Sequence, residues 1–158
     1  MIIIGYQGIG KSSIAGRNDI IDLESSNFWH KHKRPDNWYV YYCNIAEHLS
    51  KQGYIVFVSS HEVVRNRLRK YSNESVYCVF PSIHLKDEWT DRLHKRYEKT
   101  GKDKDFKAWM NAVDRYRENI TGLMQANIQF YEITDMDYRL EDIVYYLVGF
   151  DKEWHKKK

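Results

Sequence analysis

The sequence predicts an α/β protein with a single parallel β-sheet, and three observations lead to that prediction. Short apolar runs rich in β-branched residues alternate with longer segments of helical periodicity. The length of 158 residues suits one domain with one core. Charged residues make up 30% and hydrophobic residues 42%, as in a globular rather than a disordered chain. Strands that alternate with helices form βαβ units, so we expect a parallel sheet covered on both faces.

Five segments have the composition of buried strands, with apolar, β-branched and aromatic residues between polar turns. In chain order they are residues 1–4, 18–23, 54–58, 76–80 and 128–133. The third, YIVFV, is the clearest because it directly follows a turn at Gly53. Pro81 is expected to end the fourth, since proline cannot donate a ladder hydrogen bond.

Helical periodicity marks the segments between and after these strands. The expected helices are residues 11–16, 36–52, 59–70, 85–123 and 140–148. In the second, Asp36 is a candidate N-cap. The apolar stripe of that helix comprises Trp38, Tyr42, Ile45 and Leu49. Ser59 and Glu62 fit a capping box at the start of the third helix.

The longest helical region, about residues 85–123, is expected to break near Thr100 and Gly101. Its apolar stripe comprises Leu85, Trp89, Leu93 and Tyr97, and that of the last helix comprises Leu140, Ile143, Val144 and Leu147. We therefore expect one domain over residues 1–158. Residues 1–84 and 124–150 would form its core, and about 85–123 a helical lid.

Charge and cysteine content exclude several classes of protein. The net charge is +3, and the tail from Asp151 supplies much of it, which argues against a nucleic-acid partner. Cys43 and Cys78 are too few for a disulfide scaffold or a zinc site. No signal peptide or membrane-spanning run is visible, so we expect a cytoplasmic protein without a membrane partner. The oligomeric state is left open.

Residues 5–12, GYQGIGKS, match G-x-x-x-x-G-K-[ST] at every defined position. Glycines permit left-handed backbone angles and close approach to a ligand, so the freed N–H groups can form an anion nest. A lysine then contacts the β- and γ-phosphates, and a serine hydroxyl coordinates Mg²⁺. The residues expected to hold the phosphates are Gly8, Ile9, Gly10, Lys11, Ser12 and Ser13.

Carboxylates that could support Mg²⁺ follow the second strand. The third strand ends in Ser59 and Ser60, where many nucleotide-hydrolysing proteins have an acidic residue. Asp22 and Glu24 lie two residues apart at the end of the second strand and point the same way. They could hold metal-bound water or orient an acceptor hydroxyl. Ser12 and Asp22 are therefore the expected metal ligands.

The helical region supplies candidate arginines for phosphoryl transfer, which is catalysed mainly by positioning and positive charge. Arg92 and Arg96 are four residues apart and share a helix face. Arg115 lies beyond the break. A helical pair that brings arginines over the phosphates would neutralise charge and expel water.

These stretches carry a resemblance. GYQGIGKSS, IDLESSNFW, VFVSSH and FPSIHLKDEWTDRLHKRY together resemble small phage-encoded P-loop kinases of the adenylate kinase-like type. The resemblance implies a P-loop NTPase fold with strand order 2-3-1-4-5, ATP as phosphoryl donor and Mg²⁺ as cofactor. It implies that Arg92 and Arg96 are the arginines of the lid. It also implies the host cytoplasm as the compartment.

The resemblance implies an acceptor site between Asp22 and Trp38 and near residues 59–65. Its expected substrate contacts are Glu24, Ser25, Arg65 and Arg115. The segment ESSNFWHKHKRPD is shorter than the monophosphate-binding segment of adenylate kinases. The Asp22 and Glu24 pair is instead similar to that of shikimate- and gluconate-kinase-like enzymes.

The expected function is ATP- and Mg²⁺-dependent phosphoryl transfer to a nucleoside or deoxynucleoside monophosphate. Lys11, Arg92, Arg96 and Asp22 are its expected catalytic residues. One alternative is a kinase that acts on a hydroxyl of a small metabolite or of a polynucleotide end. Another is a nucleotide-binding module without kinase turnover, which the missing acid after the third strand favours.

Overall fold

The computed structural model describes residues 1–29 and 33–157. Its sheet contains five strands in the order β2-β3-β1-β4-β5, and every neighbouring pair is parallel. In chain order the strands are β1 (Ile2–Gly5), β2 (Ile20–Asp22), β3 (Ile55–Val58), β4 (Val76–Pro81) and β5 (Phe130–Ile133). The predicted parallel sheet and its strand order are confirmed.

β1 occupies the centre of the sheet because it is apolar on both faces. Ile2, Ile3 and Ile4 are each 0% exposed, as expected for a strand that helices cover on either side. In register, Ile4 pairs with Val58 of β3 and with Cys78 of β4. The loop that leaves β1 therefore lies between the carboxyl ends of its two neighbours, where α/β proteins place their ligands.

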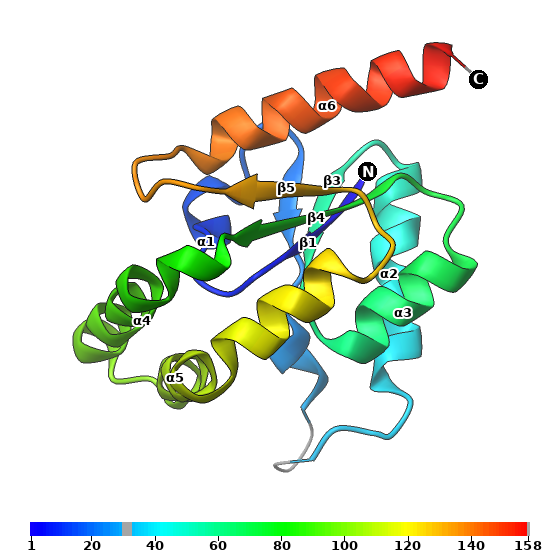
Figure 1. Ribbon diagram of the computed structural model, residues 1–158. Helices are drawn as coiled ribbons and strands as arrows, with labels where there is room; N and C mark the ends of the chain where they lie inside the picture. Colours follow the sequence, from blue (N-terminus) through cyan, green and yellow to red (C-terminus); the bar gives the residue numbers. More distant parts are fainter. Residues whose placement is uncertain (30–32, 158) are drawn as a thin grey trace.

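Helices cover both faces of the sheet, as Figure 1 shows. α1 and α6 lie on one face, whereas α2, α3 and α5 cover the other. In chain order the helices are α1 (Lys11–Ile14), α2 (Trp38–Lys51), α3 (Glu62–Tyr71), α4 (Lys86–Thr100), α5 (Asp103–Met124) and α6 (Leu140–Lys156). Two short 3₁₀ helices, η1 (Ser25–Phe28) and η2 (Ile83–Leu85), follow β2 and β4.

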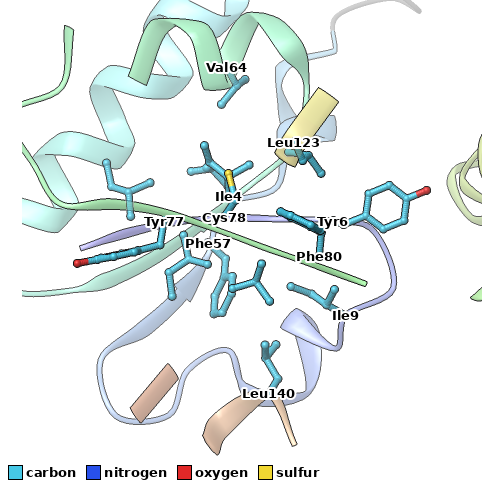
Figure 2. Packing of buried hydrophobic residues seen from close by; sticks show 14 of the residues in the cluster. Ile4, Tyr6, Ile9, Phe57, Val64, Tyr77, Cys78, Phe80, Leu123 and Leu140 are labelled. Atoms are coloured by element: carbon cyan, nitrogen blue, oxygen red, sulfur yellow. The ribbon is translucent and has the colours of Figure 1, made fainter. Parts of the chain in front are cut away.

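Close packing of apolar side chains joins the two layers of helices to the sheet (Figure 2). Val64 of α3 and Leu123 of α5 lie on one side of the strands. Ile9 of the loop after β1 and Leu140 of α6 lie on the other. The side chain of Ile9 thus anchors the first loop in the core, where it is only 1% exposed.

The starts of α2 and α3 differ from the prediction. α2 begins after Asn37, and no side chain caps it, so the capping role expected for Asp36 is wrong. α3 begins after His61, and Ser59 does not cap it. The hydroxyl of Ser59 lies 2.7 Å from Nδ1 of His61 instead. Ile45 of the expected stripe is 41% exposed, because α2 turns Cys43 and Ala46 toward the core.

The long helical region breaks where the sequence predicted. α4 ends at Thr100, and Gly101 has a left-handed φ of 63°. α4 and the first part of α5 pack along each other beyond the end of the sheet toward which β4 and β5 point, and the later part of α5 runs back along one face of the sheet (Figure 1). Trp89, Leu93 and Tyr116 are at most 1% exposed within the common core. The half of this helical pair nearer the sheet is therefore part of the core, and the proposed lid boundaries stay predictions.

In the described part of the chain, no helix combines the length and the apolar character needed to cross a membrane.

Candidate active site

The loop of residues 5–12, called the glycine-rich loop below, connects β1 to α1. Gly8 and Gly10 have φ values of 86° and 106°, which L-residues rarely adopt. A Cβ on Gly8 would lie 2.9 Å from Cδ2 of Leu93, and one on Gly5 would lie 2.8 Å from Cδ1 of Ile9. Backbone conformation and close packing therefore both require glycine here.

Three successive backbone carbonyls of this loop accept hydrogen bonds from side chains elsewhere in the fold. Nε1 of Trp89 donates to Gln7 O at 2.9 Å. Nη1 of Arg92 donates to Gly8 O at 3.2 Å. The hydroxyl of Tyr138 donates to Ile9 O at 2.7 Å.

The next carbonyl, Gly10 O, accepts from the hydroxyl of Ser13 at 2.6 Å. These contacts turn the carbonyl side of the loop toward the protein.

The N–H groups of the loop, unlike its carbonyls, are largely without hydrogen-bond partners among the described residues. Among the described residues, no acceptor is found for the backbone N–H groups of Gly8, Gly10 and Lys11. Lys11 opens α1, so its N–H belongs to the first helical turn, whose donors have no partner within the helix. The loop therefore presents a set of free amide donors, which is the arrangement that binds anions.

Lys11 adds a cation beside these donors. Its side chain is half-buried, and Nζ lies 3.5 Å from Gly5 O. Desolvation lowers the pKa of Lys11, while the nearby carboxylates of Asp22 and Glu24 raise it. Arg96 and Lys104 lower it further. The charges of Arg96 and Lys104 therefore oppose that of Lys11, and an anionic ligand beside Lys11 would relieve this repulsion.

Asp22 is the carboxylate at the end of β2. Desolvation raises its pKa, Lys11 and Lys104 lower it, and Glu24 raises it. Glu24 itself accepts a hydrogen bond from the hydroxyl of Ser26 at 3.0 Å. The predicted grouping of Asp22 with Lys11 therefore agrees with the electrostatics of the site.

A network around Arg34 lies near the ends of β2 and β3. Its guanidinium carbon is 4.3 Å from the ring centre of Trp38 and 5.0 Å from that of Trp29. Nη2 donates to the hydroxyl of Ser25 at 3.3 Å, and Nη1 lies 3.3 Å from Nε2 of His61. The two rings therefore contact the guanidinium, so its position is fixed by packing as well as by hydrogen bonds.

The contact with Arg34 also sets the protonation of His61. Arginine can only donate, so Nε2 of His61 must accept and the imidazole must be neutral. The proton then resides on Nδ1 and is donated to the hydroxyl of Ser59. Desolvation lowers the pKa of His61 to about 4, and the charges of Arg34 and Lys11 lower it in the same direction. The hydroxyl of Ser59 keeps its own hydrogen for another acceptor.

Tyr42 holds the ends of β2 and β3 together. Its hydroxyl donates to Leu23 O at 2.6 Å and accepts from the backbone N–H of Ser59 at 2.8 Å. Burial is the main cause that raises the pKa of Tyr42 above its usual range. The tyrosine therefore stays neutral and fixes the spacing of Asp22 and Ser59.

The four arginines predicted for the site occupy different environments. Arg92 contacts the carbonyl side of the glycine-rich loop. Nε of Arg96 lies 3.0 Å from Oδ1 of Asp105, an ion pair without the alignment of a hydrogen bond. Arg65 donates to Ser60 O at 3.2 Å. Arg115 is exposed and pairs with Glu118 at 2.8 Å, on the same helix.

The sequence reasoning assigned no site role to Trp89, Tyr138 or Arg34. Trp89 was assigned to the helix stripe, and it does pack in the core, but its indole N–H also reaches the loop. Tyr138 lies in the loop before α6, and no short motif includes it. Arg34 follows residues 30–32 of the expected acceptor segment, which lie outside the described residues.

One groove of the described surface lies away from the glycine-rich loop. It has a volume of about 510 Å³ and is lined by Tyr77, Phe130, Tyr146 and Phe150 among others, near the start of β4 and β5. The described residues contain no cluster of three or more histidine, cysteine or acidic side chains that could hold a metal ion.

Comparison with models of known protein families and with curated proteins found no match to this chain. The site is therefore interpreted from its own geometry.

The neutral state of His61 predicts a pH dependence of stability. The folded-state pKa of His61, about 4, lies below its ordinary value of 6.5, so the unfolded chain binds more protons between these pH values. The free energy of unfolding should therefore fall as the pH is lowered from about 6.5 toward 4. We expect a smaller fall in His61→Gln, measured by urea unfolding at pH 7 and 5. The exposed His48→Gln variant is the control. If the free energy of unfolding falls by the same amount between pH 7 and pH 5 in wild type and in His61→Gln, the prediction is contradicted.

Proposed function

We propose that the chain is a P-loop kinase that transfers a phosphoryl group from ATP, with Mg²⁺, to a nucleoside or deoxynucleoside monophosphate. The observation that carries the proposal is the polarity of the glycine-rich loop. Its carbonyls are bonded on one side, and the N–H groups of Gly8, Gly10 and Lys11 have no acceptor among the described residues. Together with the charge of Lys11, this arrangement suits the β- and γ-phosphates of a nucleoside triphosphate.

The residues present fit Mg²⁺ chemically, because the hydroxyl of Ser12 and the carboxylate of Asp22 are hard oxygen donors. If Mg²⁺ is bound there, it would supply positive charge next to the phosphates that the loop and Lys11 hold. The side chain of Ser12 is exposed at the start of α1 and so is open to a metal ion. Asp22 would act through the water ligands of the metal or on the acceptor itself.

On the donor side, the chain's own groups position and neutralise the phosphates. Lys11 would contact the β- and γ-phosphates. Arg96 and Lys104, whose charges act on Lys11, would approach from the helical pair. Such preorganised cations stabilise a loose transition state without any covalent step by the protein.

The acceptor side combines cations with aromatic rings, which supports a nucleotide acceptor. Arg34 lies between Trp29 and Trp38 and contacts His61, whose pKa also responds to Lys11. This network therefore lies within electrostatic reach of the glycine-rich loop. A phosphate ester with a planar base matches such a surface better than an uncharged sugar.

Asp22 supports a second candidate, a kinase for a hydroxyl group. Its raised pKa is suited to accepting a proton from a hydroxyl, a step that a monophosphate acceptor does not need. A polynucleotide 5′-hydroxyl is one form of this candidate. Activity of that kind would depend steeply on salt.

A phosphotransfer screen tests the proposal. Wild type and Lys11→Ala are incubated with ATP, Mg²⁺ and single acceptors, and both ADP and the phosphorylated product are measured. The panel contains each NMP and dNMP, shikimate, gluconate and a 5′-hydroxyl oligonucleotide. We expect product from one or a few monophosphates, absent in the variant. Product only from a hydroxyl acceptor would favour the second candidate. ATP binding without any product would favour a binding module.

A further inference from the structure

Three side chains hold the glycine-rich loop from its carbonyl side, and they come from two distant segments. Trp89 and Arg92 lie one turn apart on α4, and Tyr138 precedes α6. They donate in sequence to Gln7 O, Gly8 O and Ile9 O. No carbonyl in this run is skipped, so the three bonds fix the orientation of consecutive peptide planes.

The three side chains also contact one another. The rings of Trp89 and Tyr138 are stacked with centres 6.2 Å apart and planes inclined by 15°. The guanidinium carbon of Arg92 is 4.7 Å from the Trp89 ring centre and 5.3 Å from that of Tyr138. Nη1 of Arg92 also donates to the Tyr138 hydroxyl at 2.7 Å. Each member therefore restrains the other two.

The position of Arg92 bears on its role. In a loop whose N–H groups surround an anion, the carbonyls point away from that anion, so a side chain bound to a carbonyl lies outside the cradle. Nη1 of Arg92 is used twice on that outer side, for Gly8 O and for Tyr138. Arg96, one turn further along α4, acts electrostatically on Lys11 instead.

We propose that Trp89, Arg92 and Tyr138 are positioning residues that hold the glycine-rich loop with its amide donors turned inward, before any nucleotide binds. Arg92 then acts on the loop and not on the transferring phosphoryl group, in contrast to the role predicted from the sequence. The proposal rests on the proposed function only in that the loop binds phosphate. Preorganised donors bind an anion more tightly because they need no reorganisation.

Tyr138→Phe is the sharpest test, because it removes one oxygen and retains the ring. Ile9 O loses its donor, and Arg92 loses one of its two acceptors. We expect the Kd for MgADP, measured by calorimetry, to rise about tenfold, as leaving a buried carbonyl unpaired implies. Arg92→Lys should weaken binding similarly. The double variant should weaken it by less than the product of the two effects, since the residues share one network. Tyr146→Phe and Arg117→Lys, both exposed, are matched controls.

Kinetics separate positioning from direct catalysis. A positioning role predicts a higher KM for ATP in Arg92→Lys, with turnover at saturation nearly unchanged. A phosphoryl contact by Arg92 predicts that turnover at saturation falls by roughly 100-fold or more while MgADP affinity is unchanged, and this outcome would overturn the proposal. A lower urea midpoint with wild-type affinity in Tyr138→Phe would also overturn it, since the contact would then be merely structural.

The outcome for wild type distinguishes this inference from the proposed function. If wild type binds MgADP but phosphorylates no acceptor, the kinase proposal fails while the affinities of the variants still decide the inference. If wild type binds neither MgADP nor Mg²⁺-pyrophosphate, both fail. If wild type is an active kinase and the variants bind MgADP equally well, the inference alone fails.

Discussion

Lys11→Ala is expected to reduce phosphoryl transfer by roughly 10²- to 10³-fold or more, the range found when one preorganised charge-stabilising group is removed. Lys11 belongs to the loop itself, whereas Arg96 and Lys104 act on it from other elements. Neither can substitute for a side chain that starts inside the loop. Steady-state turnover with ATP and the acceptor found by the screen measures this effect.

The same variant should remain folded. Desolvation lowers the pKa of Lys11, so its charge is held at a cost in folding free energy, and its removal should not lower the urea midpoint. Lys51→Ala is the matched control, because Lys51 is exposed at the end of α2. Wild-type turnover in Lys11→Ala would contradict the assigned role.

Gly8→Ala is expected to disrupt both the fold of the loop and its ligand binding. A residue with a Cβ at φ 86° is strained by about 1–3 kcal/mol. The added Cβ would also lie 2.9 Å from Leu93 and 3.1 Å from Nε1 of Trp89, both of which are 0% exposed. Overpacking of this kind costs about 1–3 kcal/mol more. Displacement of Trp89 would break its bond to Gln7 O, so MgADP affinity should fall as well.

Gly16→Ala separates these two causes. Gly16 has nearly the same φ, 84°, but a Cβ there would meet nothing within 4 Å. The Gly16→Ala variant should lose only the stability that backbone strain costs, and it should retain wild-type affinity for MgADP. Equal urea midpoints and equal affinities for the two variants would show that the contact of Gly8 with Trp89 and Leu93 is unimportant.

Much of the fold could be predicted because local sequence and burial agree. The run of isoleucines in β1 is typical of a strand that is covered on both faces, and these residues are buried. Glycine at position 101 indicated the helix break, and its φ is left-handed in the structure. The first residues of α2 and α3 were harder to predict from the sequence. Serine is a common N-cap residue, but the hydroxyl of Ser59 bonds to His61 and its backbone N–H donates to Tyr42. The bond to Tyr42, 17 residues away in the chain, is a tertiary contact, and such contacts leave no periodic signal.

The candidate site was predictable where its residues are contiguous. Residues 5–12 form one motif, and Asp22 follows a recognisable strand, so both could be placed from local sequence alone. The partners of the loop carbonyls could not, because Trp89 and Tyr138 have the side chains of ordinary core residues. Arg34 gains its role from stacking between two rings, which depends on the path of the chain after β2.

The central place of β1 has a consequence for the order of folding. Its pairing partners, β3 and β4, begin at residues 55 and 76, so a growing chain contains an unpaired apolar strand until both have been synthesised. The last carbonyl partner, Tyr138, is separated from Ile9 by 129 residues. Contacts this distant form slowly because their loops must close first. The loop after β1 is therefore among the last parts of the described fold to reach its final conformation.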